Sequence, residues 1–415
     1  GKFCYTDKEA VVQRVDNRMP GIIAKEDVTV KQADIGIVGG GQLGRMMILE
    51  GHQLGLRFAV LDPEQQCPAA DITQHMIEGS FNDAPAIQRL ASVSRRMTFE
   101  FEHINAETLM ELESSGCQVM PSAETLHMVQ NKFRQKTFLA ARHLPVPEFC
   151  RVDSKEDVLA AAASLGLPLL LKRCTGGYDG KGNILVSHVN EIDGAYEALG
   201  GSASDMMAEK CIDFLMEISV LVARDSLGKT VTFPVGQNIH RNNILHRTLV
   251  PAPLEPIVIR EAEALAAETM AQMKGTGLFC IEMFVGRNHS LSINEIAPRT
   301  HNSGHHTIES CNISQFGQQI RALMGWPLLS PKLFSPAVMV NLLGAPHQRG
   351  KPTLRGIEEA MALGTVYPHL YGKAESRPGR KMGHVTILGE TLTKAEEIAD
   401  QVEQVVRIEV EDWEE

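Results

Sequence analysis

The sequence predicts a chain of α/β and α+β class, with a parallel-sheet domain first, a larger mixed domain second and a small β-rich domain last. Strand-like and helix-like segments alternate from residue 35 to about 129, which is typical of a small parallel sheet. Further on, two strands flank a glycine-dense loop, and two acidic strands adjoin each other. After residue 336 the apolar runs are short and few helices are indicated. We therefore expect a leader at 1–33, domains at 34–130, 131–325 and 326–395, and a tail at 396–415.

The composition is ordinary for a globular chain and argues against two classes of partner. With 415 residues, two or three domains can each bury a core. The net charge of −11 argues against nucleic acid, and no apolar run approaches a membrane span. The eight cysteines form no C-x-x-C pair, so we expect reduced, mostly buried side chains rather than a zinc site or disulfides. We expect a cytoplasmic protein, although the start at Gly1 leaves a removed targeting segment open.

In the first domain, hydrophobic pattern and capping residues predict three strands and three helices. Asn105 is the expected N-cap of the third helix, and Gly116 follows its end. The strands are expected at 35–40, 57–62 and 96–104, and the helices at 42–52, 83–93 and 106–115.

In the rest of the chain, Ser154 and Asp157 have the spacing of a capping box before a helix that Gly166 and Pro168 end. Gly325 and Pro327 likewise end a later helix. Helices are expected at 129–143, 261–274 and 314–324, and strands at 168–174, 183–188, 278–285 and 291–296, with strand-like sequence at 207–235.

The segment 39–44, GGGQLG, satisfies G-x-G-x-x-G between a strand and a helix, and Asp62 closes the next strand. Backbone N–H groups at such a helix N-terminus bind anions, as in dinucleotide sites. The motif alone leaves three alternatives open: a dehydrogenase, a tight turn without a ligand, or a site for the phosphate of another molecule.

A second glycine-rich segment, TGGYDGKG at 175–182, contains four glycines and Lys181. It is not a P-loop, because the required spacing is absent and a strand follows it. Such a loop can close its amides over polyphosphate, with Lys181 and the preceding Lys172 adding positive charge. The alternative is an ordinary glycine hairpin.

Glu282 and Glu295 lie on the two adjacent acidic strands. If a turn at 286–289 joins them, Val285 pairs with Ser290 and Glu282 pairs with Ile293. Glu295 is then diagonal to Glu282 on the same face, roughly 7–8 Å away at Cβ. Two carboxylates among apolar neighbours favour Mg²⁺ over a solvated face, but a turn one residue longer or shorter would separate them. The loop that follows, 297–306, is rich in Arg, His, Asn and Ser and suits an oxyanion or a phosphoryl group.

Together these motifs resemble those of the N5-carboxyaminoimidazole ribonucleotide synthetases, a family of ATP-grasp ligases. The resemblance runs from about residue 35 to 388 and includes GGGQLGRM, TFEFEHI, QNKFRQK, KRCTGGYDGKGN, NEIAPRTHNSGHHTIE, ISQF and RPGRKMGH. It implies a pre-ATP-grasp domain, a two-lobed ATP-grasp domain and a small C-terminal domain. It also implies that ATP and bicarbonate form carboxyphosphate, whose carbon is transferred to the amine of 5-aminoimidazole ribonucleotide in purine biosynthesis. A homodimer and association with the mutase of the next step are further expectations.

The resemblance also implies a role for individual residues. The ATP phosphates would be held by Lys132, Lys172, Gly177, Tyr178, Gly180, Gly182 and Asn183. Adenine would meet Glu209, Lys210, Cys211 and Ile212, and the rest of the nucleotide Glu217 and His240. Mg²⁺ would bind Glu282 and Glu295, with Asn294 alongside. The ribonucleotide phosphate would meet Gln42, Leu43, Lys373 and Arg380, and its imidazole Glu100, Tyr178, Asp179 and Lys181. The catalytic group would be Arg299, His301, Asn302 and Ser303, together with Asp179 and Lys181.

Three rival interpretations remain at the level of sequence. Another ATP-grasp enzyme, such as a formate-using transformylase or a biotin carboxylase, shares the metal carboxylates but not GGYDGKG together with HNSGH. A dehydrogenase does not require the carboxylate pair or the second glycine loop. A non-catalytic nucleotide-binding module would tolerate loss of one metal carboxylate, yet both are present.

Overall fold

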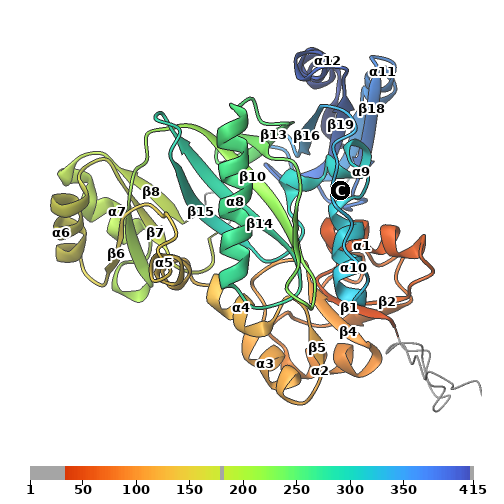
Figure 1. Ribbon diagram of the computed structural model, residues 1–415, viewed down its shortest axis with the longest axis horizontal. Coiled ribbons are helices and arrows are strands. Elements are labelled where there is room, and N and C mark those ends of the chain that lie inside the picture. Colours follow the sequence, from red (N-terminus) through yellow and green to blue (C-terminus); the bar gives the residue numbers. More distant parts are fainter. Residues whose placement is uncertain (1–32, 178–181, 412–415) are drawn as a thin grey trace, which may run out of the picture. The chain divides into compact units, whose positions relative to one another are not determined.

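The computed structural model describes residues 33–177 and 182–411. The first domain contains a five-stranded parallel sheet of order β3-β2-β1-β4-β5 (Figure 1). Its strands are β1 (Ile35–Val38), β2 (Phe58–Asp62), β3 (His75–Glu78), β4 (Arg96–Phe99) and β5 (Gln118–Val119). The predicted parallel sheet is confirmed. The sequence pattern missed β3, which is only partly buried, and β5, which has two residues.

The helices of this domain are α1 (Gln42–His52), α2 (Ala84–Val93), α3 (Ala106–Ser114) and α4 (Ala123–Val129). Asn105 caps α3 as predicted, its side chain accepting from the Thr108 amide. The strand predicted at 96–104 ends at Phe99, because Glu100 leaves the ladder and its carboxylate caps the start of α1.

The next segment forms a four-stranded antiparallel sheet of order β6-β9-β7-β8. Ser154 and Asp157 form the predicted capping box at the start of α6. The helix predicted at 129–143 is divided, since Asn131 caps a new helix by accepting from the Arg134 amide. The elements are α5 (Lys132–Ala140), β6 (Phe149–Val152), α6 (Lys155–Leu165), β7 (Leu169–Arg173), β8 (Asn183–Val186), η1 (Val189–Glu191), α7 (Ile192–Ala198), η2 (Gly201–Ala203) and β9 (Met206–Lys210).

The next part of the chain forms a nine-stranded sheet. Its strand order is β15-β14-β10-β12-β13-β16-β19-β18, and β11 pairs with β10. Its strands are β10 (Phe214–Arg224), β11 (Thr230–Thr232), β12 (Gly236–Arg241), β13 (Ile244–Val250), β14 (Gly277–Gly286), β15 (Leu291–Ala297), β16 (Ala337–Leu343), β18 (Thr365–Leu370) and β19 (Lys381–Leu388). The helices between them are α8 (Pro256–Gln272), η3 (Asn302–Gly304), α9 (Thr307–Ser310) and α10 (Gln315–Met324). The pairing of β13 with β16 carries the sheet across the boundary expected at 325.

The C-terminal part is completed by β17 (Lys351–Arg355), α11 (Ile357–Met361), α12 (Leu392–Val405) and β20 (Arg407–Glu411). The expected boundary at 395 falls inside α12, and β20 pairs with β17. The segment expected as a tail is therefore structured as far as residue 411.

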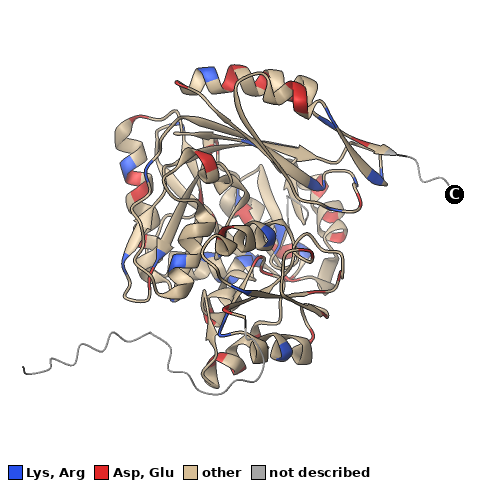
Figure 2. Ribbon diagram, turned by 90° about the vertical axis from the view of Figure 1, so that its right-hand side faces the viewer, with Lys and Arg blue, Asp and Glu red and all other residues tan. Residues whose placement is uncertain are grey.

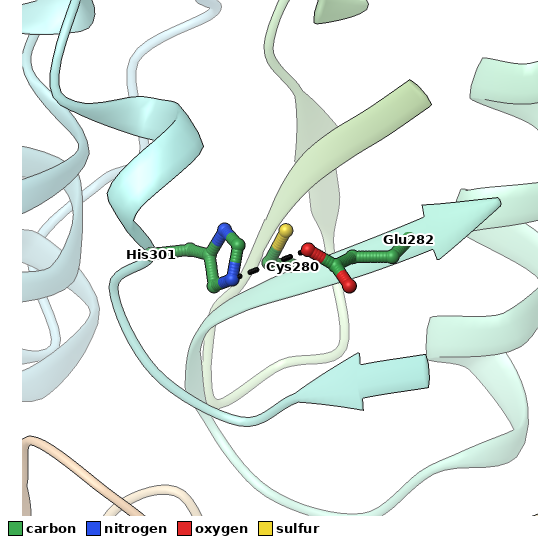
Figure 3. Close-up of side chains that lie close together, drawn as sticks. All are labelled: Cys280, Glu282 and His301. Atoms are coloured by element: carbon green, nitrogen blue, oxygen red, sulfur yellow. Dashed lines mark ion pairs between the residues drawn. The ribbon is translucent and has the colours of Figure 1, made fainter. Parts of the chain in front are cut away.

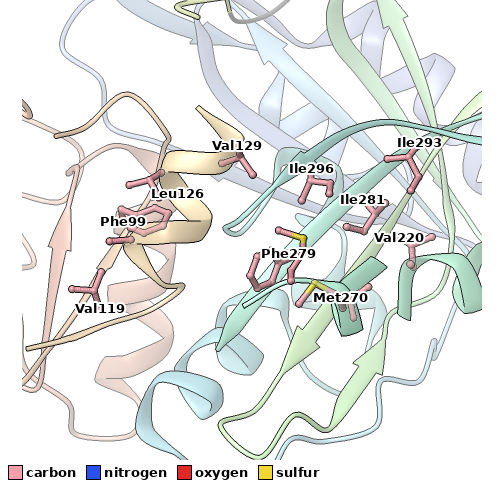
Figure 4. Close-up of a cluster of buried hydrophobic side chains, with 14 of the residues drawn as sticks. Phe99, Val119, Leu126, Val129, Val220, Met270, Phe279, Ile281, Ile293 and Ile296 are labelled. Atoms are coloured by element: carbon pink, nitrogen blue, oxygen red, sulfur yellow. The ribbon is translucent and has the colours of Figure 1, made fainter. Parts of the chain in front are cut away.

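One apolar core connects the first sheet to the large sheet (Figure 4). It joins Phe99 of β4 and Leu126 of α4 to Phe279 and Ile281 of β14, which are all almost fully buried. Met270 of α8 covers the same strands from the helix side. This shared core fixes the end of β4, where Glu100 and Glu102 follow, relative to the acidic strands.

Acidic and basic residues are interspersed along the helices and strands (Figure 2). Among the described residues, no helix combines the length and apolar character that crossing a bilayer requires. The seven described cysteines are free, and Cys67, Cys174, Cys280 and Cys311 are buried.

Candidate active site

Glu282 and Glu295 are direct cross-strand partners on β14 and β15. The predicted register is wrong by one residue, because Val285 pairs with Leu291 rather than with Ser290. That change alone would place Glu295 on the opposite face. The ladder shifts between Met283, which pairs with Ile293, and Glu282, which pairs with Glu295. Asn294 is the extra residue of this bulge, and it returns Glu295 to the face of Glu282.

The two carboxylates have different electrostatic surroundings. Burial and the charge of Glu295 raise the pKa of Glu282 to about 7. Desolvation acts to raise the pKa of Glu295 as well, but Lys132 and Lys172 lower it overall. Lys132 Nζ lies 3.7 Å from a Glu295 oxygen, whereas the ion-pair partner of Glu282 is His301, at 3.3 Å. Glu282 thus lacks a permanent cation at contact distance among the described residues.

Glu209 is the centre of a buried lysine cluster beside this pair. Lys172 Nζ donates to one of its oxygens at 2.5 Å, and Lys136 Nζ lies 3.0 Å from the other. Burial acts to raise the pKa of Glu209, but the two lysines lower it below its ordinary value. Burial lowers the pKa of Lys136 to about 8. One pocket is lined by Lys132, Gln135, Lys136, Lys172, Met207, Glu209, Asn294 and Glu295.

The side chain of Glu209 is therefore engaged by two lysines, and its expected contact with adenine remains a prediction. Lys210 is the last residue of β9, and Cys211 and Ile212 follow it; their expected contacts with adenine also remain predictions. Gly177, Gly182 and Asn183 border the second glycine loop, and Asn183 pairs with Lys172 across β7 and β8. Tyr178, Asp179, Gly180 and Lys181 lie outside the described residues, so their expected roles remain predictions.

Glu217 and His240 meet on neighbouring strands of the large sheet. His240 Nδ1 lies 2.6 Å from a Glu217 oxygen. Burial opposes a charged imidazole, but the bond to Glu217 raises the pKa of His240 overall. Glu217 lies on β10 and His240 on β12. Strand β10 also contains Ser219, which is the cross-strand partner of Glu282 on β14, so the pair lies next to the acidic strands.

The loop after β15 is held by hydrogen bonds to three separate elements. Arg299 faces Glu102, with nitrogen–oxygen distances of 2.8 and 3.1 Å. His301 Nδ1 lies 2.8 Å from Ser303 Oγ, which accepts from Ser219 Oγ at 2.9 Å. The amide of Asn302 exchanges two hydrogen bonds with Asn341 of β16, at 2.7 and 2.9 Å. Four of the six predicted catalytic side chains, those of Arg299, His301, Asn302 and Ser303, are thus fixed beside the acidic strands of the large sheet.

The first glycine turn binds a carboxylate of the protein itself. Glu100 accepts from the amides of Gly41 and Gly44 at 2.5 and 2.7 Å. A Cβ added at Gly39 or Gly41 would come within 2.4 or 2.5 Å of Glu100, which accounts for glycine at both positions. Burial raises the pKa of Glu100 against the lowering effect of these amides. Gln42 and Leu43, in the first turn of α1, still have amides without an intrahelical acceptor.

Lys373 and Arg380 line a second pocket beside this turn. The remaining residues of its lining are Glu64, Gln65, Gln66, Pro68, Ala374 and Glu375. Burial and the charge of Arg380 lower the pKa of Lys373 to about 8, while Glu100 acts in the opposite direction. The structure therefore brings the two cations predicted from the C-terminal domain to residues 64–68 of the first domain, and the charge of Glu100, which binds the glycine turn, acts on Lys373.

Comparisons with protein families match nearly the whole described chain. Residues 32–130 match the ribonucleotide synthetase preATP-grasp domain, residues 137–316 the ATP-grasp domain, and residues 337–398 the phosphoribosylaminoimidazole carboxylase C-terminal domain. The N5-carboxyaminoimidazole ribonucleotide synthase of Bacillus subtilis is 37% identical over 356 residues, which cover 86% of this chain and 91% of that protein.

The chain belongs to the N5-carboxyaminoimidazole ribonucleotide synthase family.

Solved structures of this family agree with the fold. The synthetase from Thermotoga maritima has a TM-score of 0.84 and 37% identity, covering 92% of this chain and all of that chain. The Aspergillus clavatus enzyme in complex with ADP and 5-aminoimidazole ribonucleotide has a TM-score of 0.82 and 31% identity, covering 90% and 99%. The phosphoribosylaminoimidazole carboxylase of Ogataea methanolica is longer. It is 39% identical over 375 residues, which cover 87% of this chain and 67% of that protein. The recognised family, the fold class and the assignment as an ATP-grasp ligase are confirmed.

Sequence reasoning missed several residues of this synthase site. Lys136 and Gln135 are fully buried helix residues whose side chains reach backbone carbonyls of β15. Lys136 sits four residues after Lys132, the helical spacing that places two side chains on one face, and this signal was available. Glu102 and Asn341 offered no such pattern, because their partners lie 197 and 39 residues away.

Proposed function

We propose that the protein carboxylates 5-aminoimidazole ribonucleotide with bicarbonate and ATP, forming N5-carboxyaminoimidazole ribonucleotide, ADP and phosphate. In the first step a bicarbonate oxygen attacks the γ-phosphorus of ATP, and ADP leaves with the electron pair of the broken bond. In the second step the amine attacks the carbon of carboxyphosphate, which releases phosphate. The observation that carries the proposal is the direct pairing of Glu282 and Glu295 beside Lys132 and Lys172.

The residues present fit a divalent cation at this pair. Glu282 has a pKa raised to about 7 and no permanent cation at contact distance among the described residues, while Glu295 lies directly opposite. Two such carboxylates with phosphate oxygens and water are a suitable ligand set for Mg²⁺. When bound, the ion would neutralise charge on the transferring phosphoryl group.

The lysine cluster would bind the ATP phosphates. Lys172 donates a hydrogen bond to Glu209. A phosphate that enters the pocket would accept from the same ammonium group, which has further N–H bonds to donate. The carboxylate of Glu209 fixes the ammonium groups of Lys172 and Lys136 before the nucleotide arrives. Preorganised cations of this kind stabilise developing charge without reorganisation during the reaction.

Arg299 and the loop at 301–303 would position bicarbonate. Glu102 orients the guanidinium of Arg299 by two contacts, and the Asn302–Asn341 pair holds the loop against β16. His301 Nε2 is directed to Glu282, next to the expected phosphoryl group. Fixed donors at this position hold bicarbonate for attack and reduce the entropy cost of bringing the reactants together.

The pocket at Lys373 and Arg380 would bind the phosphate of the ribonucleotide. A phosphate here has two cations beside it and the amides of Gln42 and Leu43 within the adjacent helix turn. Glu100 already accepts from Gly41 and Gly44, which disfavours the pyrophosphate of a dinucleotide at the same turn. This observation favours the synthase over a dehydrogenase.

We further propose that the protein acts as a cytoplasmic homodimer and associates with the mutase that uses its product. The chain covers 67% of the length of the Ogataea methanolica carboxylase, so that relative contains a further segment to which the chain has no counterpart in the match. Co-purification with a separately expressed mutase would test the association, the mass of the purified protein in solution would test the dimer, and cell fractionation would test the location.

The chemistry is tested by isotope transfer. Bicarbonate labelled with ¹⁸O should deliver one labelled oxygen to the inorganic phosphate, because a bicarbonate oxygen bridges carbon and phosphorus in carboxyphosphate. Phosphate without label, formed in step with ADP and the carboxylated product, would refute this route. The Glu295→Gln variant, treated in the same way, measures the background rate of label transfer to phosphate.

A further inference from the structure

Three potential metal ligands of different chemistry meet at the edge of the carboxylate pair (Figure 3). Cys280 and Glu282 are two residues apart on β14, so both side chains project from the same face. His301 approaches from the loop after β15. A thiol sulfur, a carboxylate oxygen and an imidazole nitrogen all lie within 4.8 Å of one another.

Ser303 orients the imidazole toward this point. Its Oγ lies 2.8 Å from His301 Nδ1 and 3.9 Å from Cys280 Sγ, and it accepts from Ser219 Oγ. His301 Nδ1 also lies 3.3 Å from the amide nitrogen of Ser303, which donates to it when Nε2 carries the proton. Metal binding requires the other tautomer, in which Nδ1–H donates to Ser303 Oγ and the lone pair of Nε2 faces Glu282, at 3.3 Å. Metal-binding histidines commonly have their second nitrogen held in this way, which fixes the ring for coordination.

We propose that Cys280, Glu282 and His301 form a binding site for a thiophilic divalent cation such as Zn²⁺, which shares Glu282 with the proposed Mg²⁺ site but adds sulfur and nitrogen ligands. Sulfur, nitrogen and one carboxylate oxygen with an open fourth position suit Zn²⁺. Mg²⁺ instead requires oxygen ligands. On binding, the S–H bond of Cys280 breaks, its proton goes to solvent, and the thiolate electron pair is donated to the metal.

Entry to the site is from the side of the acidic pair. The side chains of Glu282 and His301 are 22% and 16% exposed, whereas Cys280 is fully buried. An incoming ion therefore meets oxygen and nitrogen first and sulfur last. Glu282 is shared with the proposed magnesium ligands, so Zn²⁺ should inhibit the enzyme in competition with Mg²⁺, a consequence that rests on the proposed function.

The test of binding uses Cd²⁺ and needs no activity. Full-length protein, kept reduced by a non-thiol reductant, is titrated with Cd²⁺ while thiolate-to-metal charge-transfer absorption is recorded. Wild type should develop this absorption at one equivalent, and Cys280→Ser should lose it, with Zn²⁺ affinity falling at least about tenfold. Cys311→Ser is the matched control, since Cys311 is a buried cysteine of the same apolar cluster; it should behave as wild type.

Unchanged absorption in Cys280→Ser, or no stoichiometric site in wild type, would overturn the proposal. If Cys280→Ser does not fold, His301→Gln, compared by the same titration, must lower the affinity by a similar factor. Zn²⁺ inhibition is then measured at several Mg²⁺ concentrations in wild type and in the cysteine variants. A protein that binds Cd²⁺ through Cys280 but shows no bicarbonate-dependent ATP turnover would retain the metal site and refute the proposed function.

Discussion

Glu295 lies close both to a second carboxylate and to a lysine. It faces another glutamate directly across the ladder, and its nearest cation is Lys132, at 3.7 Å. Repulsion from Glu282 is tolerated because lysines lower the pKa of Glu295 and burial keeps Glu282 partly protonated near neutral pH. A bound cation would remove this repulsion, so the charge of Glu295 should matter for catalysis rather than for folding.

We therefore expect Glu295→Gln to lower turnover by at least about a hundredfold while the melting temperature changes by only a few degrees. Steady-state kinetics over a range of Mg²⁺ concentrations, together with thermal unfolding, measures both. Glu261→Gln, an exposed position on α8, is the control and should retain wild-type kinetics. Near-full turnover of Glu295→Gln at low Mg²⁺ would show that Glu295 is not a ligand.

Arg380 should serve the acceptor and not the nucleotide. It lines the pocket beside the first glycine turn together with Lys373. Arg380→Ala should raise the KM for the ribonucleotide by about 10- to 100-fold, equivalent to roughly 1.5–3 kcal/mol, and leave the KM for ATP nearly unchanged. Arg377→Ala, an exposed residue of the same loop, is the matched control. A change confined to the KM for ATP would place this loop in the nucleotide site.

For single residues, the sequence predicted which side chains form the site, but it did not predict every residue that each of them contacts. The shared face of Glu282 and Glu295 is confirmed, yet for a different reason from the one predicted. The turn is one residue longer than expected, and the bulge at Asn294 compensates for it. Similarly, the sequence predicted that the amides of the glycine turn bind a phosphate. In the structure two of these amides donate to Glu100, which lies 59 residues after Gly41. Long-range contacts of this kind leave no local pattern.

Among the elements, α12 is bound to the large sheet through two carboxylates, Asp400 and Glu403, of which Glu403 is the more buried. Glu403 meets Arg247 of β13, with His246 at 2.8 Å and Arg241 at 3.6 Å. Burial acts to raise the pKa of Glu403, but hydrogen bonds from His246 and Arg247 lower it to about 2. The carboxylate is one-fifth exposed, so solvent screens these contacts only in part.

Glu403→Gln should destabilise the protein by about 2–3 kcal/mol at neutral pH. The folded pKa lies below the unfolded value, so this contribution is complete above about pH 5 and is lost as the pH falls toward 2. Denaturant unfolding of wild type and variant at pH 7 and near pH 3 should show the difference at least roughly halved at the lower pH. Glu397→Gln, an exposed position on the same helix, should have little effect at either pH. A difference independent of pH would contradict the ionic origin.

Elements with strong periodicity and caps were predicted well, and short edge elements were not. The capping box of α6, the Asn105 cap of α3 and the Gly325 end of α10 are confirmed. Strand β3 is only partly buried and so lacks the apolar run by which a buried strand is recognised. The end of the chain was expected as a tail, because β20 has only one partner, β17, from which 51 residues separate it in the sequence.

In the whole molecule, the proposed reaction needs three regions that are far apart in the sequence to meet. The first sheet contributes Glu100 and Glu102 after β4, the large sheet contributes the acidic pair, and the C-terminal strands contribute Asn341 and the Lys373 loop. The continuous pairing of β13 with β16 and the core shared by β4 and β14 hold these regions together. The sequence motifs predicted the three domains, whereas this continuity depends on pairings between distant strands.

The central claim is that ATP is cleaved here only to carboxylate the aminoimidazole ribonucleotide. The most direct test is ADP release by the purified protein with ATP and Mg²⁺, measured with bicarbonate, with the ribonucleotide, with both and with neither, while NADH binding is followed by fluorescence. We expect rapid ADP release only when both substrates are present, and no NADH binding. Tight NADH binding without bicarbonate-dependent ADP release would contradict the account and favour a dehydrogenase.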